Sequence, residues 1–154
     1  ERRFRTSKTK TRTMTNLSKE SVDYFGLNIP FMQCIGLQPE HFSAELTRTR
    51  LPWRADLTNS RGDIHGGTLM SALDLTLSAS ARAKDPSTSM ATIDMATHFL
   101  APATGNVVFE ARCLRMGKSI AFCEGRALDE DGNILVTATA TFKIIWPRPD
   151  QATS

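Results

Sequence analysis

Three features near the start of one apolar helical stretch could take part in chemistry. They are Asn59, the run Gly62-Asp-Ile-His-Gly-Gly67 and Asp74. Consecutive glycines at a helix start let a backbone or ligand approach closely, and the first N–H groups of a helix have no partner within it. With the helix dipole, these groups form a site for an anion or a developing oxyanion. A tight turn into the helix would also explain the two glycines.

Asp74 is unusual because aspartate is a poor residue for a helix interior. It stands between Leu73 and Leu75, in a stretch of otherwise apolar or small residues. Burying an unpaired carboxylate is costly, so such a residue is normally paired or functional. Two structural explanations stay open: Asp74 points to a wet edge of the helix, or it bonds a nearby hydroxyl.

The spacing of Gly66 and Asp74 limits how one site could use both. They are eight residues apart, which is about 12 Å along a helix. A carbonyl held at the helix start is therefore out of reach of a water activated by Asp74 of the same helix. If both residues serve one site, a second copy of the helix must run antiparallel beside the first. A two-fold dimer would supply two such shared sites.

The elements that must position these residues follow from hydrophobic periodicity. Gly66–Lys84 is the long helix, closed by Asp85-Pro86, and its composition predicts burial on all sides. Alternating residues predict strands at 42–51, 91–100, 106–115, 119–128 and 134–146. Short helical pieces are expected at 17–27 and 29–35. This order predicts an α+β fold in which a curved, five-stranded antiparallel sheet wraps one buried central helix.

Charge and composition exclude several classes of protein. The net charge is +3, but residues 1–13 carry +5 and the rest of the chain therefore −2, so we expect no nucleic-acid partner. The longest uncharged stretch, Tyr24–Pro39, is too short for a membrane span. We expect a basic tail over 1–16, one domain over 17–146 and a second tail over 147–154. Residues 1–13 could be native, a transit-peptide remnant or an artificial leader.

The rest of the sequence shows neither a metal-ligand spacing nor one of the common catalytic motifs. Cys34, Cys113 and Cys123 have no metal-ligand spacing and are interpreted as reduced core residues of a cytoplasmic protein. His41 and His98 have no ligand-spaced partner. The phosphate-loop, nucleophile-elbow and HExxH templates all fail. We therefore expect no metal site.

Asn59-x-x-Gly62-x-x-His65-Gly66-Gly67, followed by Asp74, resembles the signature of the PaaI-like acyl-CoA thioesterases of the hotdog-fold superfamily. Three later motifs are similar to the rest of that pattern, over roughly Leu46–Ile145: Thr92-Ile-Asp-Met-x-x-x-Phe99-Leu-x-Pro102, Arg115-Met-Gly-Lys-Ser, and Asp131-Gly-x-x-Leu-x-x-x-Ala-x-x-x-Phe142. The resemblance implies a hotdog fold, a homodimer with a continuous sheet, and commonly a homotetramer built from two dimers.

The resemblance also implies roles for individual residues. Asp74 matches the catalytic carboxylate, as general base or nucleophile, and Gly66 and Gly67 match the helix start that polarises the thioester carbonyl. Asn59 and His65 match residues that position the water and the thioester end, and Thr92 matches a residue that orients the water. The segments implied to contact CoA contain Phe99, Pro102, Arg115, Met116, Gly117, Lys118 and Ser119. Arg115 and Lys118 suit phosphates chemically. CoA belongs to the substrate, and no cofactor is implied.

Two alternatives remain open at this point. A hotdog-fold acyl-CoA dehydratase would use a histidine and an acid facing one another, and His65 directly before two glycines fits a thioesterase better. A non-catalytic acyl-CoA sensor would bind without turnover. The acyl preference is not readable, so aromatic, medium-chain and branched acyl groups all stay possible substrates.

Overall fold

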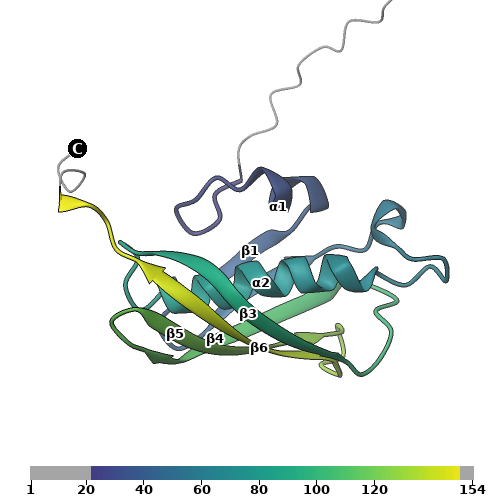
Figure 1. Ribbon diagram of the computed structural model, residues 1–154. Helices are drawn as coiled ribbons and strands as arrows, with labels where there is room; N and C mark the ends of the chain where they lie inside the picture. Colours follow the sequence, from purple (N-terminus) through teal and green to yellow (C-terminus); the bar gives the residue numbers. More distant parts are fainter. Residues whose placement is uncertain (1–21, 150–154) are drawn as a thin grey trace, which may run out of the picture.

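The computed structural model describes residues 22–149, in which an antiparallel sheet surrounds a long helix (Figure 1). The helical elements are α1 (Pro30–Ile35), the short 3-10 helix η1 (Ala55–Leu57) and α2 (Gly66–Arg82). The strands are β1 (Gln38–Phe42), β2 (Thr47–Leu51), β3 (Ser89–Phe99), β4 (Val107–Met116), β5 (Ile120–Leu128) and β6 (Ile134–Ile145). The long helix and the four strands after it are confirmed to within two residues at each boundary.

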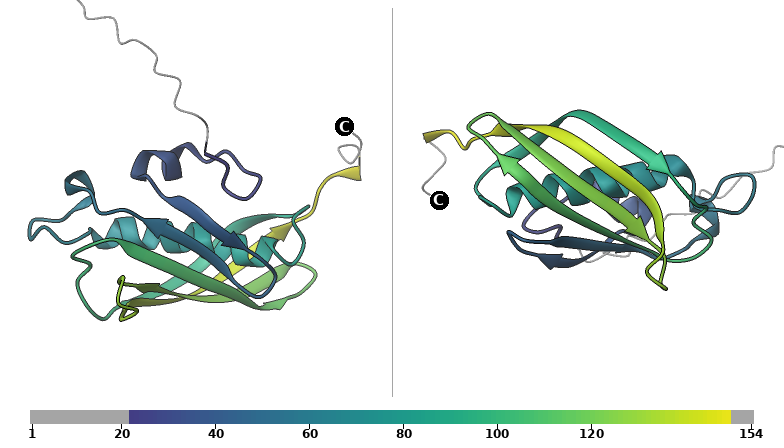
Figure 2. Two further views of the ribbon diagram at one scale, coloured as in Figure 1. Left: turned by 180° about the vertical axis from the view of Figure 1, so that it is seen from behind. Right: turned by 90° about the horizontal axis from the view of Figure 1, so that it is seen from below.

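The sheet has the strand order β1-β2-β4-β5-β6-β3, and every neighbouring pair is antiparallel. Its strands curve around α2, as the view from below shows (Figure 2). On β6, Ala138 and Ala140 are buried whereas the threonines between and beside them are not. Small side chains therefore line the inner face of β6. The predicted wrapping of a sheet around one helix is therefore confirmed.

The prediction of five strands is wrong by one. Residues 42–51 alternate as one strand would, but the chain turns between Phe42 and Thr47 and forms a hairpin of β1 and β2. The Ser43 hydroxyl accepts the N–H groups of Glu45 and Leu46 and so closes this turn. A side chain that satisfies backbone donors in this way competes with the strand ladder.

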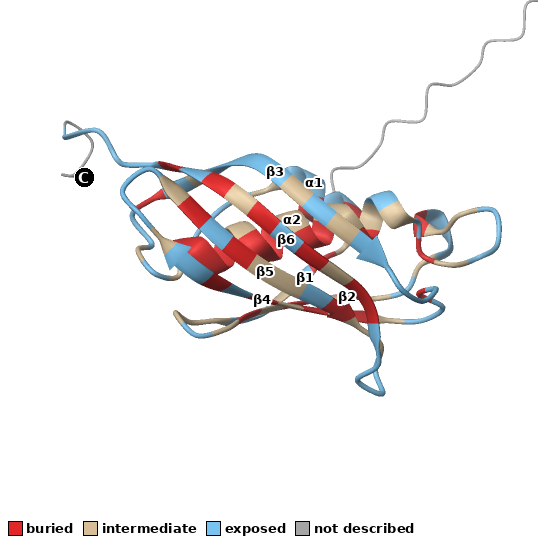
Figure 3. Ribbon diagram, turned by 60° about the horizontal axis from the view of Figure 1, so that its bottom comes forward, coloured by how far each residue is buried: buried red, intermediate tan, exposed pale blue. Residues whose placement is uncertain are grey.

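The helix α2 is largely buried, but not on all sides as expected. Gly67 is exposed, and Met70, Ser71, Asp74 and Ser78 are partly exposed. These positions recur every three or four residues and therefore form one stripe along the helix. Ala72, Thr76 and Ala79 on the opposite side are almost fully buried. In Figure 3, α2 lies behind the strands and much of it is coloured as buried. The chain thus leaves one face of its central helix partly uncovered.

The N-terminal predictions fare unevenly. The helix expected over 17–27 begins outside the described residues, and the described part, 22–27, is not helical. Phe25 and Gly26 both have positive φ angles, 57° and 89°, which a helix cannot accommodate. Tyr24 is fully buried and donates a hydrogen bond to the Leu37 carbonyl at 2.9 Å. The second piece is confirmed as α1, and Gly36 ends it in the left-handed conformation.

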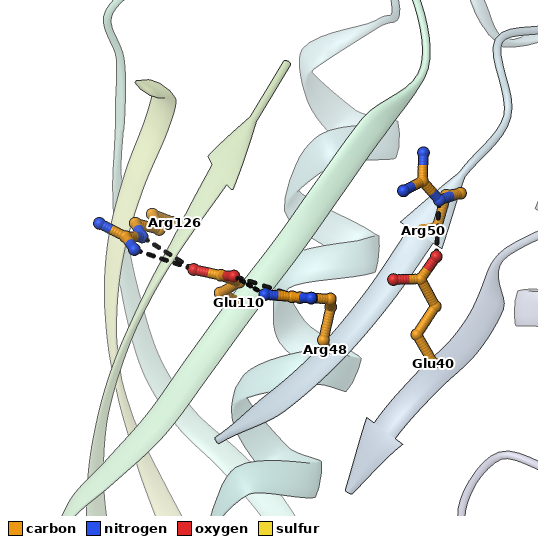
Figure 4. A network of polar contacts seen from close by, with 5 residues as sticks. All are labelled: Glu40, Arg48, Arg50, Glu110 and Arg126. Carbon is orange, nitrogen blue, oxygen red and sulfur yellow. Dashed lines mark hydrogen bonds and ion pairs between the residues drawn. The ribbon is translucent and has the colours of Figure 1, made fainter. Parts of the chain in front are cut away.

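The outer face of the sheet, away from α2, carries paired charges (Figure 4). Glu110 on β4 accepts hydrogen bonds from Arg48 on β2 and Arg126 on β5. Arg50 pairs with Glu40 at 2.6 Å.

Three further predictions concern the whole chain. No helix in residues 22–149 is long and apolar enough to cross a membrane. The tail predicted over 1–16 lies outside the described residues, as do residues 150–154 of the C-terminal one. Cys113 and Cys123 are buried as expected, whereas Cys34 is exposed because it falls on the outer side of the short helix α1. The interpretation of all three cysteines as core residues is therefore wrong for Cys34.

Candidate active site

The start of α2 presents one free backbone donor. His65 is the N-cap, and its Nδ1 accepts the Gly67 N–H at 2.9 Å. The N–H groups of Thr68 and Leu69 both reach the His65 carbonyl. Within residues 22–149, the Gly66 N–H has no acceptor. Of the two glycines expected to polarise a carbonyl, Gly66 is thus the one with a donor to offer, since the histidine cap occupies Gly67.

Phe99, at the end of β3, covers Gly66 closely. A Cβ atom built on Gly66 would lie only 3.2 Å from Cε1 of this ring, so the absence of a side chain is what admits the ring. Phe99 is about half exposed. Pro102 is also exposed, and the Ala103 carbonyl accepts the Ile64 N–H at 2.8 Å. The predicted segment 99–104 therefore lies beside the helix start.

Asn59 belongs to the loop that leads into α2. Its side-chain oxygen accepts the N–H groups of Arg61 and Asp63, and Gly62 takes a positive φ of 85°. The His65 N–H bonds the Leu57 carbonyl and brings the loop back to the helix. Asn59 thus shapes the turn that presents His65 and Gly66. Its expected role in positioning a water stays a prediction.

Asp74 and Thr92, two predicted site residues 18 positions apart, meet directly. The Thr92 hydroxyl on β3 donates to Oδ1 of Asp74 at 2.8 Å. Asp74 belongs to the partly exposed stripe of α2, and Thr92 is exposed. Of the explanations that stayed open, Asp74 therefore fulfils both: it bonds a hydroxyl, and it faces the wet side of the helix. Within residues 22–149, its second carboxylate oxygen has no hydrogen-bond partner.

The structure separates the remaining predicted residues into a distant group. Arg115, Met116, Gly117, Lys118 and Ser119 make the end of β4 and its turn into β5. In Figure 1, this turn and the end of β6 lie at the left, opposite the start of α2. Met116 pairs with Ala121 on β5, Ala121 pairs with Phe142 on β6, and Phe142 pairs with Thr92 on β3. Three strand spacings place Met116 about 14 Å from Thr92.

Trp146 is a residue that sequence reasoning used only as the end of a strand. Its indole N–H donates to the Lys118 carbonyl at 2.7 Å, so it contacts the segment expected to bind CoA. An aromatic residue at the end of the last strand was the available signal. No group of three His, Cys, Asp or Glu side chains within the described part of the chain could hold a metal ion.

An antiparallel sheet wrapped around one long helix, with a glycine-rich helix start, defines the hotdog class of protein. The family model "Thioesterase superfamily" matches residues 61–136, the part that contains the helix start, Asp74 and Thr92. The chain is 30% identical over 114 residues to a protein of Halobacterium salinarum that has been provisionally named an esterase. These residues are 70% of this chain and 73% of that protein. The chain belongs to the thioesterase superfamily.

Solved structures agree on the fold. A thioesterase of Haemophilus influenzae matches with a TM-score of 0.70 at 16% identity, over 75% of this chain and 82% of that one. A mutant of the phenylacetic acid degradation protein PaaI of Thermus thermophilus matches with a TM-score of 0.68 at 20% identity, over 75% and 98%. The fold is therefore the hotdog fold, and the family supports thioester hydrolysis as the class of reaction.

Proposed function

We propose that this protein hydrolyses acyl-CoA thioesters to a free acid and CoA, in an active site shared between two protomers. One observation carries the proposal: Thr92 holds the Asp74 carboxylate on the partly exposed stripe of α2. A carboxylate fixed on an accessible helix face, in a fold of this family, is suited to act on a bound thioester.

The residues supply two complementary functions. The Gly66 N–H, at the positive end of the helix dipole, would donate to the thioester oxygen and stabilise the negative charge that develops there. Asp74 would remove a proton from water as the water oxygen attacks the carbonyl carbon, or would itself attack that carbon. In either case the C–S bond breaks and the CoA thiolate takes up a proton. After attack by Asp74 itself, water hydrolyses the acyl–Asp74 anhydride, which releases the free acid and restores the carboxylate.

The proposed dimer follows from the length of α2. The helix is continuous from Gly66 to Arg82, so Gly66 and Asp74 of one chain stay about 12 Å apart. An antiparallel second copy of α2 would bring Gly66 of one chain beside Asp74 of the other. Strand β3 supports this proposal, because it is an 11-residue edge strand with mostly exposed residues. Long free edges tend to be covered by another strand.

The partners proposed are thus the acyl-CoA substrate and a second copy of the chain, with a homotetramer of two dimers as the expected assembly. No nucleic acid, metal or separate cofactor is expected to take part. A cytoplasmic location also stays a prediction.

The first test measures free thiol release from a panel of aromatic, medium-chain and branched acyl-CoA substrates. Asp74→Asn preserves size but cannot accept a proton or attack, so it should lower kcat by about 10²-fold or more. Asp94→Asn is the matched control, because Asp94 is exposed on the same strand as Thr92 and should leave kcat unchanged. Near wild-type kcat in Asp74→Asn would refute the assignment. Binding without thiol release would indicate a sensor, and modification of the acyl group with the thioester intact a dehydratase.

The second test concerns the shared site. Gly66→Pro removes the free N–H while proline suits the first position of a helix, and the His65 ψ of 135° suits a residue before proline. Because a Cβ atom at this position would lie 3.2 Å from the half-exposed Phe99 ring, Gly66→Ala, which adds the Cβ but keeps the N–H, is the control. Asp74→Ala removes the carboxylate. Gly66→Pro and Asp74→Ala should each be inactive alone, but mixed dimers of the two contain one intact site and should recover up to about half of wild-type activity. No recovery, with mixed dimers verified by two tags, would place the site within one chain.

A further inference from the structure

One end of the sheet combines unpaired positive charge with an exposed tryptophan. We call it the cationic tip, and it consists of residues 114–122 and 143–149. These ranges contain four cations and no acid. The cations are Arg115, Lys118, Lys143 and Arg148. Strand pairing places Lys143 opposite Ile120, so the two ranges lie side by side.

The arginines of the cationic tip differ from those on the outer face of the sheet. Arg48, Arg112 and Arg126 each pair with a glutamate. In the part of the chain that the structure describes, Arg115 and Arg148 pair with no acid, and both are exposed. Guanidinium groups without a carboxylate are available for phosphate oxygens, which they bind in a bidentate manner.

Trp146 is fixed within this charged surface. Its indole N–H bonds the Lys118 carbonyl at 2.7 Å, and the Ile144 N–H bonds the Ser119 carbonyl at 2.8 Å. The turn between β4 and β5 is thus held to β6 at two points. Because the indole N–H of Trp146 has an acceptor, the ring is held in place. The residue is nevertheless 49% exposed. An immobilised ring that remains open to solvent is suited to stack on a flat ligand.

A fixed aromatic ring among unpaired cations matches a ligand with a heteroaromatic base and several phosphates. Stacking holds the base, and the cations hold the phosphates. Met116, at the β4 side of the tip, lies about 14 Å across the sheet from Thr92, whereas Lys143 pairs with Ala91 beside Thr92. Thr92 in turn holds Asp74. An extended chain between the phosphates and the reacting thioester could bridge such a distance. The adenine nucleotide of CoA, with its phosphopantetheine arm, has this chemistry.

We infer that Trp146 is a positioning residue for the CoA nucleotide, whose adenine stacks on the indole while Lys143 and Arg148 join Arg115 and Lys118 around the phosphates. This inference rests on the proposed function, because it takes acyl-CoA as the substrate. The same protomer then supplies the cationic tip and Asp74 to one substrate molecule.

Tryptophan fluorescence tests the contact without any turnover. The chain has two tryptophans, and Trp53→Phe leaves Trp146 as the only reporter. Titration with CoA and with adenosine 3′,5′-bisphosphate should both change its emission, whereas pantetheine and inorganic pyrophosphate should not. If pyrophosphate changed the emission equally, the inferred stacking would be overturned, because phosphate alone would then be sufficient for the change. Unchanged emission while calorimetry detects CoA binding would also overturn it.

Kinetics then separate positioning from a structural role. Trp146→Ala should raise KM for acyl-CoA by about 5- to 150-fold, the range expected for one lost base stack, and leave KM for the matching acyl-pantetheine unchanged. Trp146→Phe keeps an aromatic face and should recover most of the loss. Trp53→Ala is the control, since Trp53 is a comparably exposed tryptophan that precedes η1. Equal losses on both substrates in Trp146→Ala would overturn the inference.

The two proposals fail in different ways. If no acyl-CoA releases thiol but adenosine 3′,5′-bisphosphate still changes Trp146 emission, the nucleotide site stands and hydrolysis is refuted. If thiol is released and Trp146→Ala behaves like wild type on acyl-CoA, hydrolysis stands and the role of Trp146 is refuted.

Discussion

The hydrogen bond between Thr92 and Asp74 allows a quantitative prediction. Thr92→Val keeps the shape of the side chain but removes the hydroxyl that donates to Asp74 at 2.8 Å. A hydrogen bond to a charged group contributes about 1.5–3 kcal/mol. Thr92 is exposed and Asp74 only half-buried, so water can partly replace the hydroxyl and the lower end applies. A loss of about 1.5 kcal/mol corresponds to a roughly tenfold lower kcat.

The assay is steady-state thiol release with the best acyl-CoA, with kcat and KM determined separately. We expect kcat to fall and KM to change little, because Thr92 orients the carboxylate and does not reach the nucleotide end. Thr92→Ser restores the hydroxyl and should restore most of kcat.

Thr97→Val provides a matched control on the same strand. The Thr97 hydroxyl is buried and has no partner within residues 22–149, so its removal breaks no hydrogen bond and kcat should not fall. If Thr92→Val keeps wild-type kcat, or if both valine variants lose activity equally, the reasoning about Asp74 is refuted.

Three further predictions concern stability. Burial raises the pKa of Glu110, but hydrogen bonds and charges from two arginines outweigh this effect and hold the pKa below its usual range. The ionised carboxylate therefore stabilises the fold above about pH 4.3, and this stabilisation is lost as the pH falls through the lower pKa of the folded state. Glu110→Gln should lower the free energy of unfolding at pH 7 by about 1–2 kcal/mol, and in denaturant titrations the difference should vanish near pH 2; a difference that persists there would contradict the assignment. Gly125→Ala would place a Cβ 2.9 Å from the Glu110 carbonyl oxygen and 3.0 Å from Leu77, and this overpacking should cost about 1–3 kcal/mol. Gly105→Ala, with open space around it, should leave the melting temperature unchanged. Thr47→Val removes a buried hydroxyl without a partner in the described chain and should raise stability by about 1 kcal/mol; a lower melting temperature would show that the hydroxyl has a partner.

Local patterns in the sequence determined most of the fold. The helix 66–82 was predictable because its apolar residues are continuous and Asp85-Pro86 stops it. The four strands after it were predictable because each alternates between buried and exposed residues and ends at a turn. The spacing of Gly66 and Asp74 also determined that one helix cannot bring them together. These are properties of neighbouring residues, which the rise and period of a helix or strand translate into distance.

Only the tertiary structure decided which distant side chains meet. Alternation continues through Phe42–Leu51 and hides the turn between β1 and β2, because Ser43 favours a turn only weakly and the pairing of the two strands is not a property of neighbouring residues. The bond from Trp146 to Lys118 joins residues 28 positions apart, and the pairs of Glu110 depend on which strands lie side by side. The partly exposed stripe on α2 likewise depends on how far the sheet reaches around the helix. Periodicity shows which face of an element is apolar, but the packing of whole elements decides what covers that face and which polar groups find partners.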